Sequence, residues 1–373
     1  MKTASLSRIL GAALGVAAST TIASAQQHGV LFTADNAAAG NHVWVVSRSG
    51  ATLALTNSYA TGGLGLGTAD GLPSQGSILL SPDGAWLLVC NAGSGEISVF
   101  ETLAGGALQL TDKVASGGLR PVSVAMNGTL VYVLNADGGA GSVDNVTAFH
   151  LGCGNLTMLP GSTRFLSGTN TGPAEVAITR DGEHLIVTEK ASNLIDTWEL
   201  GVDGLASSHL TFTSLGATPY GFAVGRGGKV FVSEAAGGAA GASSVSSYSV
   251  GATGTLTTVS AKVPTDQTAA CWLALSPSGS LLYTGNAGAG TLSAFKVRAN
   301  GEISLVTTGG DTANIGAGTH PADLAFSHNG ALLFSLNNGN GSISAFEVKG
   351  NGSLQSMGGL RGLPSTAAGL AAW

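Results

Sequence analysis

Charged residues are scarce in this sequence, and so are cysteines and long apolar runs. Only 10% of the 373 residues are charged, the formal net charge is −6, and the Lys and Arg residues are scattered. Because no basic run could neutralise successive phosphates, we expect no nucleic-acid partner. No stretch reaches the roughly 20 consecutive apolar residues of a spanning helix, so we expect no membrane span.

The cysteines are too few to staple the fold. There are three, Cys90, Cys153 and Cys271, and an odd number cannot form a complete disulfide framework. One pair remains possible, and the sequence does not say which. Cys90 ends an apolar strand and is interpreted as a small core residue.

The N-terminal residues have the pattern of an export signal. Basic residues precede an apolar run over 9–18, and a small-x-small motif ends at Ala25. The pattern predicts a signal peptide over 1–25, so we expect a secreted or periplasmic protein whose mature chain is 26–373.

Glycine is abundant, with 58 copies, and it punctuates an internal repeat. In each unit of about 44 to 54 residues, a first strand, a Gly-bearing turn, a second strand, a third strand ending in an aromatic residue and a fourth strand follow one another. Four short antiparallel strands make one propeller blade. The six complete copies have their cores at 77–100, 122–149, 174–198, 221–248, 272–295 and 322–346.

The two ends of the mature chain complement each other. Segments 30–35, 43–48 and 52–55 look like a second, third and fourth strand, and 369–373 looks like a first strand. Pairing them would remove the open edges of the array. The sequence therefore predicts an all-β, seven-bladed β-propeller of four-stranded antiparallel blades, a single domain over 26–373 whose first blade is closed by the N- and C-terminal strands.

Several segments resemble the seven-bladed lactonase-like propellers, a family that includes 6-phosphogluconolactonases and carboxymuconate-cyclising enzymes. They are Ser-Gln-Gly-Ser at 74–77, the run 90–100, Arg-Pro-Val-Ser at 120–123, Thr-Glu-Lys at 188–190, Thr-Pro-Tyr-Gly-Phe at 218–222 and Cys-Trp at 271–272. The resemblance implies a propeller fold and lactone chemistry, although one fold hosts many activities.

The chain also departs from the 6-phosphogluconolactonase-like members. Where they typically have Gly-Pro-Arg-His before the fourth blade, this chain has Gly-Pro-Ala-Glu at 172–175, although the later Glu189 is kept. An Arg that the family places after a late Asn is replaced by Asn338. These departures argue against a phosphogluconate substrate in particular.

The topology predicts which residues meet at one mouth of the channel. In an antiparallel meander the start of the first strand and the end of the second lie at the same end of the blade. The expected second strands all end in Asn or Glu, at Asn36, Asn91, Asn135, Glu189, Glu234, Asn286 and Asn337. The Asn residues are candidates for substrate binding, or alternatively turn formers that tolerate left-handed backbone.

Glu has no such turn preference, so we predict that Glu189 and Glu234 are a catalytic acid and base at this mouth. His320 is a further candidate base, or alternatively a structural turn residue before Pro321. Arg120 would clamp an anion or an oxyanion, unless it is a solvated loop charge. The remaining candidates at first-strand starts are Gln75, Tyr220 and Trp272, and the two aromatic residues could instead pack between blades.

Two functions follow from these residues. The first is a secreted hydrolase or isomerase that opens or closes a small lactone, and the second is a non-catalytic propeller that binds a ligand or protein. The partner would be a lactone or carboxylate. We expect no cofactor and no metal, since no dense Asp cluster supports Ca²⁺, and we expect a monomer.

Overall fold

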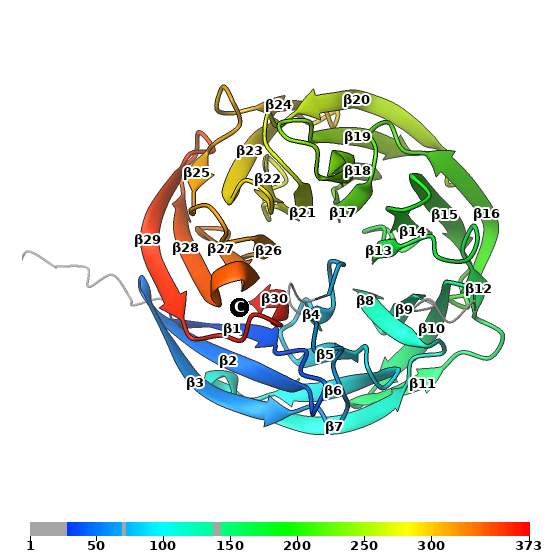
Figure 1. Ribbon diagram of the computed structural model, residues 1–373. Coiled ribbons are helices and arrows are strands. Elements are labelled where there is room, and N and C mark those ends of the chain that lie inside the picture. The colour runs from blue at the N-terminus through cyan, green and yellow to red at the C-terminus, as the bar shows by residue number, and fades with distance from the viewer. Residues whose placement is uncertain (1–27, 69–71, 137–142) are drawn as a thin grey trace, which may run out of the picture.

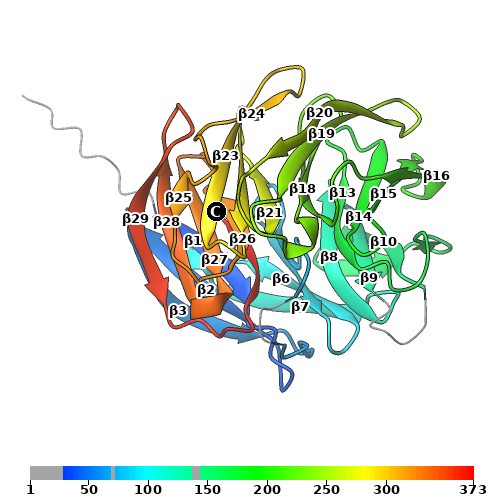
Figure 2. The same ribbon diagram turned by 45° about the horizontal axis from the view of Figure 1, so that its top comes forward.

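The computed structural model describes residues 28–68, 72–136 and 143–373. Seven antiparallel sheets surround a central channel, and each sheet runs from an inner strand at the channel to an outer strand at the rim (Figure 1). The tilted view shows the sheets as upright blades of a disc (Figure 2). This arrangement confirms the predicted propeller. The predicted signal peptide lies outside the described residues.

The strands of blades 1 to 7 follow a common order from the channel outwards. The inner strands are β30 (Ala368–Ala372), β4 (Ile78–Leu80), β8 (Arg120–Asn127), β13 (Pro173–Ile178), β17 (Pro219–Val224), β21 (Ala270–Leu275) and β26 (Pro321–Phe326). The second strands are β1 (His28–Ala34), β5 (Trp86–Asn91), β9 (Leu130–Ala136), β14 (His184–Glu189), β18 (Lys229–Glu234), β22 (Leu281–Asn286) and β27 (Leu332–Asn337).

The third strands are β2 (His42–Ser49), β6 (Glu96–Thr102), β10 (Asn145–Gly152), β15 (Leu194–Leu200), β19 (Ser244–Val250), β23 (Thr291–Val297) and β28 (Ser342–Val348). The outer strands are β3 (Thr52–Ala60), β7 (Leu108–Ala115), β11 (Asn155–Met158) with β12 (Arg164–Phe165), β16 (Ala206–Thr213), β20 (Leu256–Pro264), β24 (Ile303–Leu305) with β25 (Ala313–Asn314), and β29 (Leu354–Arg361). The short 3₁₀ turns are η1 (Ala104–Gly106), η2 (Ala236–Gly238) and η3 (Asn338–Asn340). None of the helical turns in the described part of the chain is long and apolar enough to cross a membrane.

The first blade is closed by both ends of the described chain, as predicted. Strand β30 pairs antiparallel with β1, with Leu31 opposite Ala372 and Phe32 opposite Ala371. The pairing ends in two backbone hydrogen bonds between Val30 and Trp373, of 3.1 and 2.8 Å. No edge of β1 is therefore left open.

The turns that join first to second strands lie at the end of the blades away from the predicted mouth. Three of them carry Gly in the left-handed region, at Gly84 (φ 72°), Gly182 (φ 81°) and Gly330 (φ 71°). Glycine is needed there because a Cβ makes this conformation costly. The predicted hairpins at these positions are confirmed.

The core consists of apolar clusters between neighbouring blades. The largest combines Tyr132 from β9 with Trp198 from β15, and both side chains are fully buried. Cys90 is buried in the cluster between blades 2 and 3, as interpreted from the sequence. All three cysteines are free thiols, so the possible disulfide is not formed.

Candidate functional site

The two glutamates predicted to face the channel mouth are instead enclosed between strands. The Glu234 carboxylate accepts hydrogen bonds from the Gly216 N–H (2.8 Å) and the Ser246 hydroxyl (2.6 Å), and also from the Ser214 and Ser244 hydroxyls. These donors belong to β19 and to the connector before blade 5, and the side chain is 0% exposed. Glu234 therefore fastens the connector to its blade.

Glu189 has an equivalent place in blade 4. Its carboxylate accepts hydrogen bonds from the Ser167 N–H (3.0 Å) and hydroxyl and from the Ser192 hydroxyl (2.6 Å), and it is also fully buried. Burial, together with the neighbouring Asp196 carboxyl, raises the pKa of Glu189. Glu189 and Glu234 are both 0% exposed and are engaged by separate sets of donors, so the expectation of two carboxylates open to a common ligand is wrong. Their acid–base role stays a prediction.

The asparagines at the ends of the other second strands also form hydrogen bonds within the fold. Four of them are fully buried and hydrogen-bond groups of their own blade, of the preceding connector or, for Asn91, also of blade 1, so none of the four presents an open side chain to the mouth. Their partners are Asn41 and Thr61 for Asn91, Ser116 and Asn145 for Asn135, Thr291 and Ser293 for Asn286, and Ser342 and Ser344 for Asn337.

The reason for this difference is a shift of one residue. Successive side chains of a strand point to opposite faces, so the residue after each second strand points the other way. In blade 4 that residue is Lys190, which lines a cavity at the mouth, whereas Glu189 lines none of the cavities described. The sequence holds the signal, since the cationic Lys190 directly follows a second strand, but the prediction fell on Glu189, one residue earlier.

Gln75 crosses the channel. Its side chain donates to the Leu273 carbonyl (2.6 Å) and accepts from the Leu273 N–H (3.0 Å), while its backbone N–H donates to the Ala174 carbonyl (2.9 Å). The segment leading into β4 projects towards the centre of the ring (Figure 1). Gln75 therefore joins blade 2 to blades 4 and 6, and both polar ends of its predicted substrate-binding amide are engaged by protein.

The two aromatic candidates support this crossing segment. The indole N–H of Trp272 donates to the Ser74 carbonyl (3.1 Å), and the rings of Tyr220 and Trp272 lie 5.2 Å apart. Both residues are buried, at 8% and 6% exposed, in one cluster with Cys271. Their contacts are those of residues that pack between blades, which is the alternative given above for both.

His320 is exposed at the mouth and has a left-handed backbone, with φ 48°. The same conformation recurs immediately before the inner strands of blades 4, 5 and 6, at Gly172, Thr218 and Ala269. The repeat therefore accounts for the His320 backbone, and a role for its side chain as a base stays a prediction.

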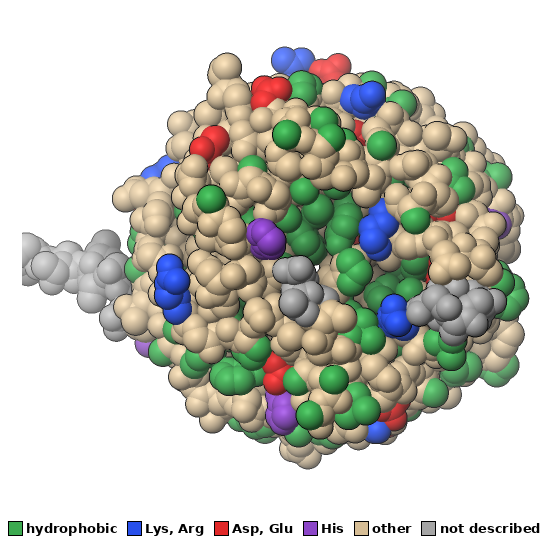
Figure 3. Space-filling view, viewed as in Figure 1, with side chains coloured by type: hydrophobic (Ala, Val, Ile, Leu, Met, Phe, Trp, Pro, Cys, Tyr) green, Lys and Arg blue, Asp and Glu red, His purple; other side chains and the backbone are tan. Residues whose placement is uncertain are grey.

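A cavity of about 210 Å³ at the mouth is lined by two cations, Arg120 and Lys190, and by the Asp144 carboxylate. The Lys190 amine donates to the Gly172 (3.0 Å) and Pro173 (3.2 Å) carbonyls. Burial lowers the pKa of this amine to about 8. Figure 3 shows Lys or Arg side chains beside a central hollow with hydrophobic walls.

A second, larger cavity of about 280 Å³ lies along the channel, lined by the middle of the inner strands. It contains Glu175, which accepts from the Phe222 N–H, and Asp323, which accepts from the N–H groups of Leu324 (2.8 Å) and Leu370 (2.9 Å). Burial raises the pKa of both carboxyls, to about 7 for Asp323. Neither Glu175 nor Asp323 is among the site residues predicted from the sequence.

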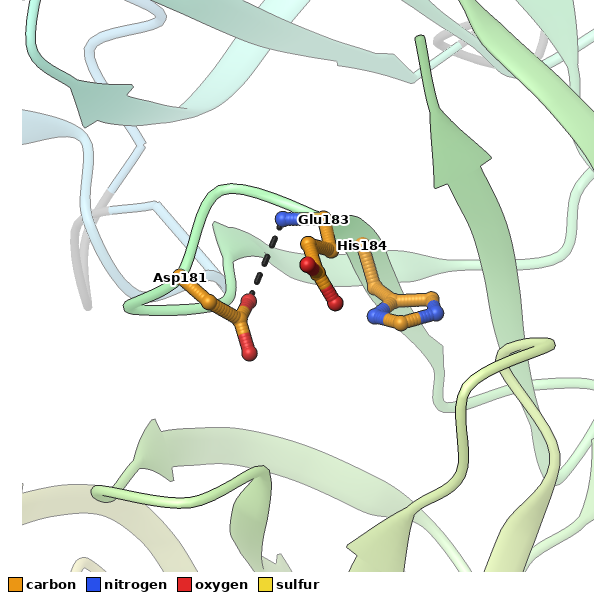
Figure 4. A group of neighbouring side chains, drawn as sticks. All are labelled: Asp181, Glu183 and His184. Carbon is orange, nitrogen blue, oxygen red and sulfur yellow. Dashed lines mark hydrogen bonds between the residues drawn. The ribbon is translucent and has the colours of Figure 1, made fainter.

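One group of side chains in the described residues could offer three metal ligands. Asp181, Glu183 and His184 lie together (Figure 4). They belong to the turn between β13 and β14, at the other end of β14 from Lys190. Asp181 already accepts from the Thr179 hydroxyl (2.6 Å) and the Glu183 N–H (3.1 Å). These bonds explain the cluster as an ordinary turn.

The site is thus a small cationic pocket at one mouth of a seven-bladed propeller channel. The chain belongs to the family described as "Lactonase, 7-bladed beta-propeller", whose sequence profile matches residues 22–160 and 226–316, more than half of the chain. None of the curated protein sequences compared with the chain matches it.

Solved structures share the fold. A candidate 6-phosphogluconolactonase from Bacteroides uniformis is 19% identical, with a TM-score of 0.71 over 92% of this chain and 99% of that one. The periplasmic gluconolactonase of Pseudomonas aeruginosa is 16% identical, with a TM-score of 0.71 over 93% and 99%. A candidate 6-phosphogluconolactonase from Bacteroides fragilis is 20% identical, with a TM-score of 0.69 over 92% and 98%.

Proposed function

We propose that the protein is an exported lactonase that hydrolyses a small lactone in the pocket between Arg120 and Lys190. The observation that carries the proposal is that Arg120 and Lys190 line the same cavity at the mouth. Family membership and neighbours named as gluconolactonases support lactone chemistry. The signal-like N-terminus supports export.

Lys190 has the geometry of a general base. A neutral amine has two N–H groups and one lone pair, and the Gly172 and Pro173 carbonyls occupy both donors. The lone pair is then left to take a proton from water. A lysine whose pKa is lowered to about 8 by burial is deprotonated in a useful fraction near neutral pH.

In the proposed reaction, water attacks the lactone carbonyl carbon while Lys190 accepts its proton. Arg120 stabilises the oxyanion that develops on the carbonyl oxygen. The bond from the carbonyl carbon to the ring oxygen then breaks, and the ring oxygen takes the proton from Lys190. The product is a hydroxy acid, which ionises and releases a proton to the solution.

The experiment is a panel of lactones offered to the purified mature protein, with turnover followed by proton release. Glucono-1,5-lactone, its 6-phosphate and muconolactone separate the substrate classes. Lys190→Met and Arg120→Met should each lower kcat/KM by roughly 10² to 10⁴-fold. Lys349→Met is the matched control, because Lys349 is paired with Glu347 in blade 7, outside the pocket.

A non-catalytic binding propeller is the second candidate function. It is favoured by the full engagement of Glu189 and Glu234 within the fold, which leaves the mouth without an open carboxylate from either of them. Binding of a lactone or hydroxy acid that weakens in Arg120→Met, with no turnover of any lactone in the panel, would select this function.

A further inference from the structure

A further cavity, larger than the two at the channel, lies away from the channel mouth. It has a volume of about 500 Å³ and lies between blades 1 and 2, where β1 begins and β4 and β6 end. These strand ends belong to the face opposite Lys190. The volume is in the range of sites for small organic molecules.

A buried cation lines this cavity. Arg48 of β2 is only 6% exposed, and within the described part of the chain its guanidinium donates one hydrogen bond, from Nη1 to the Gly50 carbonyl (3.2 Å). Among the described residues, no carboxylate lies within ion-pair distance of its guanidinium. Burial of an unpaired charge is unfavourable, and it lowers the pKa of Arg48.

The backbone opposite makes room for this guanidinium. Gly29 pairs with Arg48 in the sheet, and a Cβ at position 29 would lie 2.7 Å from the Trp373 backbone oxygen, 2.8 Å from Arg48 Nη2 and 2.9 Å from Nε. A side chain at position 29 would therefore displace the cation. Glycine at this strand position holds the guanidinium beside the cavity.

Apart from His28, Ser47 and Thr102, the other walls are apolar and include two aromatic side chains. Val30, Phe32, Leu80 and Leu103 line the cavity, together with Trp373. The Trp373 ring packs over Gly84, where a Cβ would come within 3.0 Å of it, and its ring centroid lies 4.2 Å from that of His328. The indole thus contacts Gly84 and His328, and 38% of Trp373 remains exposed.

We propose that this cleft binds a small organic monocarboxylate, with the carboxylate on Arg48 and the apolar or aromatic body against Trp373. A guanidinium matches a single carboxylate with two parallel hydrogen bonds. A doubly charged phosphate would need a second permanent cation to balance its charge. Arg48 is the only Lys or Arg among the described residues that line the cavity, so a singly charged carboxylate fits better. The ligand would pair the buried charge and fill the cavity.

The test is isothermal titration of the mature protein with benzoate, 2-naphthoate and octanoate at millimolar concentrations, each beside its neutral amide. We expect at least one carboxylate to bind and its amide to bind at least tenfold more weakly. Arg48→Met should weaken the carboxylate at least tenfold, about 1.4 kcal/mol. It should leave any lactone turnover at Lys190 unchanged, so the experiment tests the carboxylate site independently of the proposed lactonase activity.

A second variant guards against misfolding of Arg48→Met. Ala104→Trp places a large side chain at an exposed position of the cavity wall and leaves the guanidinium in place. It should also abolish binding, while Arg120→Met at the channel mouth should not weaken it. The proposal is overturned if none of the three carboxylates binds, or if the affinity survives Ala104→Trp.

Discussion

The side chain of Gln75 spans the channel and forms two hydrogen bonds with the backbone of Leu273, as a neighbouring β-strand would. Leu273 lies in blade 6, and Gln75 precedes the inner strand of blade 2. In blades 3 and 4, a side chain of the inner strand accepts a hydrogen bond from a backbone N–H of the next blade. In blade 3, for example, the Ser123 hydroxyl accepts from the Val176 N–H. Blade 5 has Gly221 at this place, and Gln75 supplies the missing acceptor to blade 6.

We predict that Gly221→Ala weakens this crossing. A Cβ at position 221 would lie 2.0 Å from Gln75 Oε1 and 2.7 Å from the Cys271 carbonyl, so the amide must move away from Leu273. Such overpacking should lower the free energy of unfolding by about 1–3 kcal/mol, measured by denaturant titration. Gly350→Ala is the control, since nothing lies within 4 Å of its added Cβ. If the two variants are equally stable, the hydrogen bonds of Gln75 across the channel do not contribute to the stability of the fold.

We predict that Glu234→Gln destabilises the protein, whatever the protein does chemically. The carboxylate accepts from one N–H and three hydroxyls, and an amide nitrogen cannot accept a hydrogen bond. The free energy of unfolding should fall by about 1–3 kcal/mol.

Glu302→Gln, which removes an exposed carboxylate paired with Arg298, should change the stability little. A Glu234→Gln protein that is as stable as the parent but inactive would restore the catalytic interpretation of this residue.

The contrast between Glu189 and Lys190 shows how far the sequence could lead. Repeats and Gly-bearing turns determine the blades, because strand periodicity and turn chemistry are local. The direction of a side chain at a strand end depends on the last residue that pairs, and a shift of one residue exchanges a carboxylate enclosed between strands for an amine that lines a cavity. Local sequence patterns do not predict the end of a strand to within one residue.

The crossing by Gln75 and the burial of Asp323 could not be predicted for another reason. Both depend on which blades face each other across the channel, and partners such as Gln75 and Leu273 are 198 residues apart in the chain. A sequence pattern gives each blade separately. The closure of the ring brings these side chains together.

We predict that deletion of residues 370–373 exposes the edge of β1. The deletion removes the pairing of Leu31 and Phe32 with β30 and leaves an unpaired strand edge, which favours aggregation. The melting temperature should fall by several degrees, and light scattering should detect oligomers.

Trp373→Ala is the control, because it keeps the backbone hydrogen bonds to Val30 and removes only the ring. If the truncated protein melts with the parent and stays monodisperse, the closure contributes little to stability.

We predict that Asp323 makes stability depend on pH. Its pKa is raised by burial from 3.8 to about 7, so the folded state holds the proton more tightly than the unfolded state. This contribution is complete below pH 3.8 and is lost as the pH rises through 7, by up to about 1.4 kcal/mol per pH unit.

Asp323→Asn lacks this titration. The stability of the variant relative to the parent should therefore rise between pH 4 and 7, measured by urea unfolding at a series of pH values. Asp311→Asn, at an exposed position, controls for the lost charge. A constant difference across this range would show that Asp323 titrates alike in the folded and unfolded states.

The last prediction concerns the protonation state in which Lys190 acts. If its lone pair takes the proton from water, kcat/KM should rise with pH and level off above the pKa of about 8 that burial gives the amine. Lys190→Arg keeps the positive charge but cannot deprotonate, so it should be as inactive as Lys190→Met and lack the rising limb. Full activity in Lys190→Arg, with kcat/KM falling above pH 8, would instead mean that the ammonium group stabilises the oxyanion and that another group supplies the base.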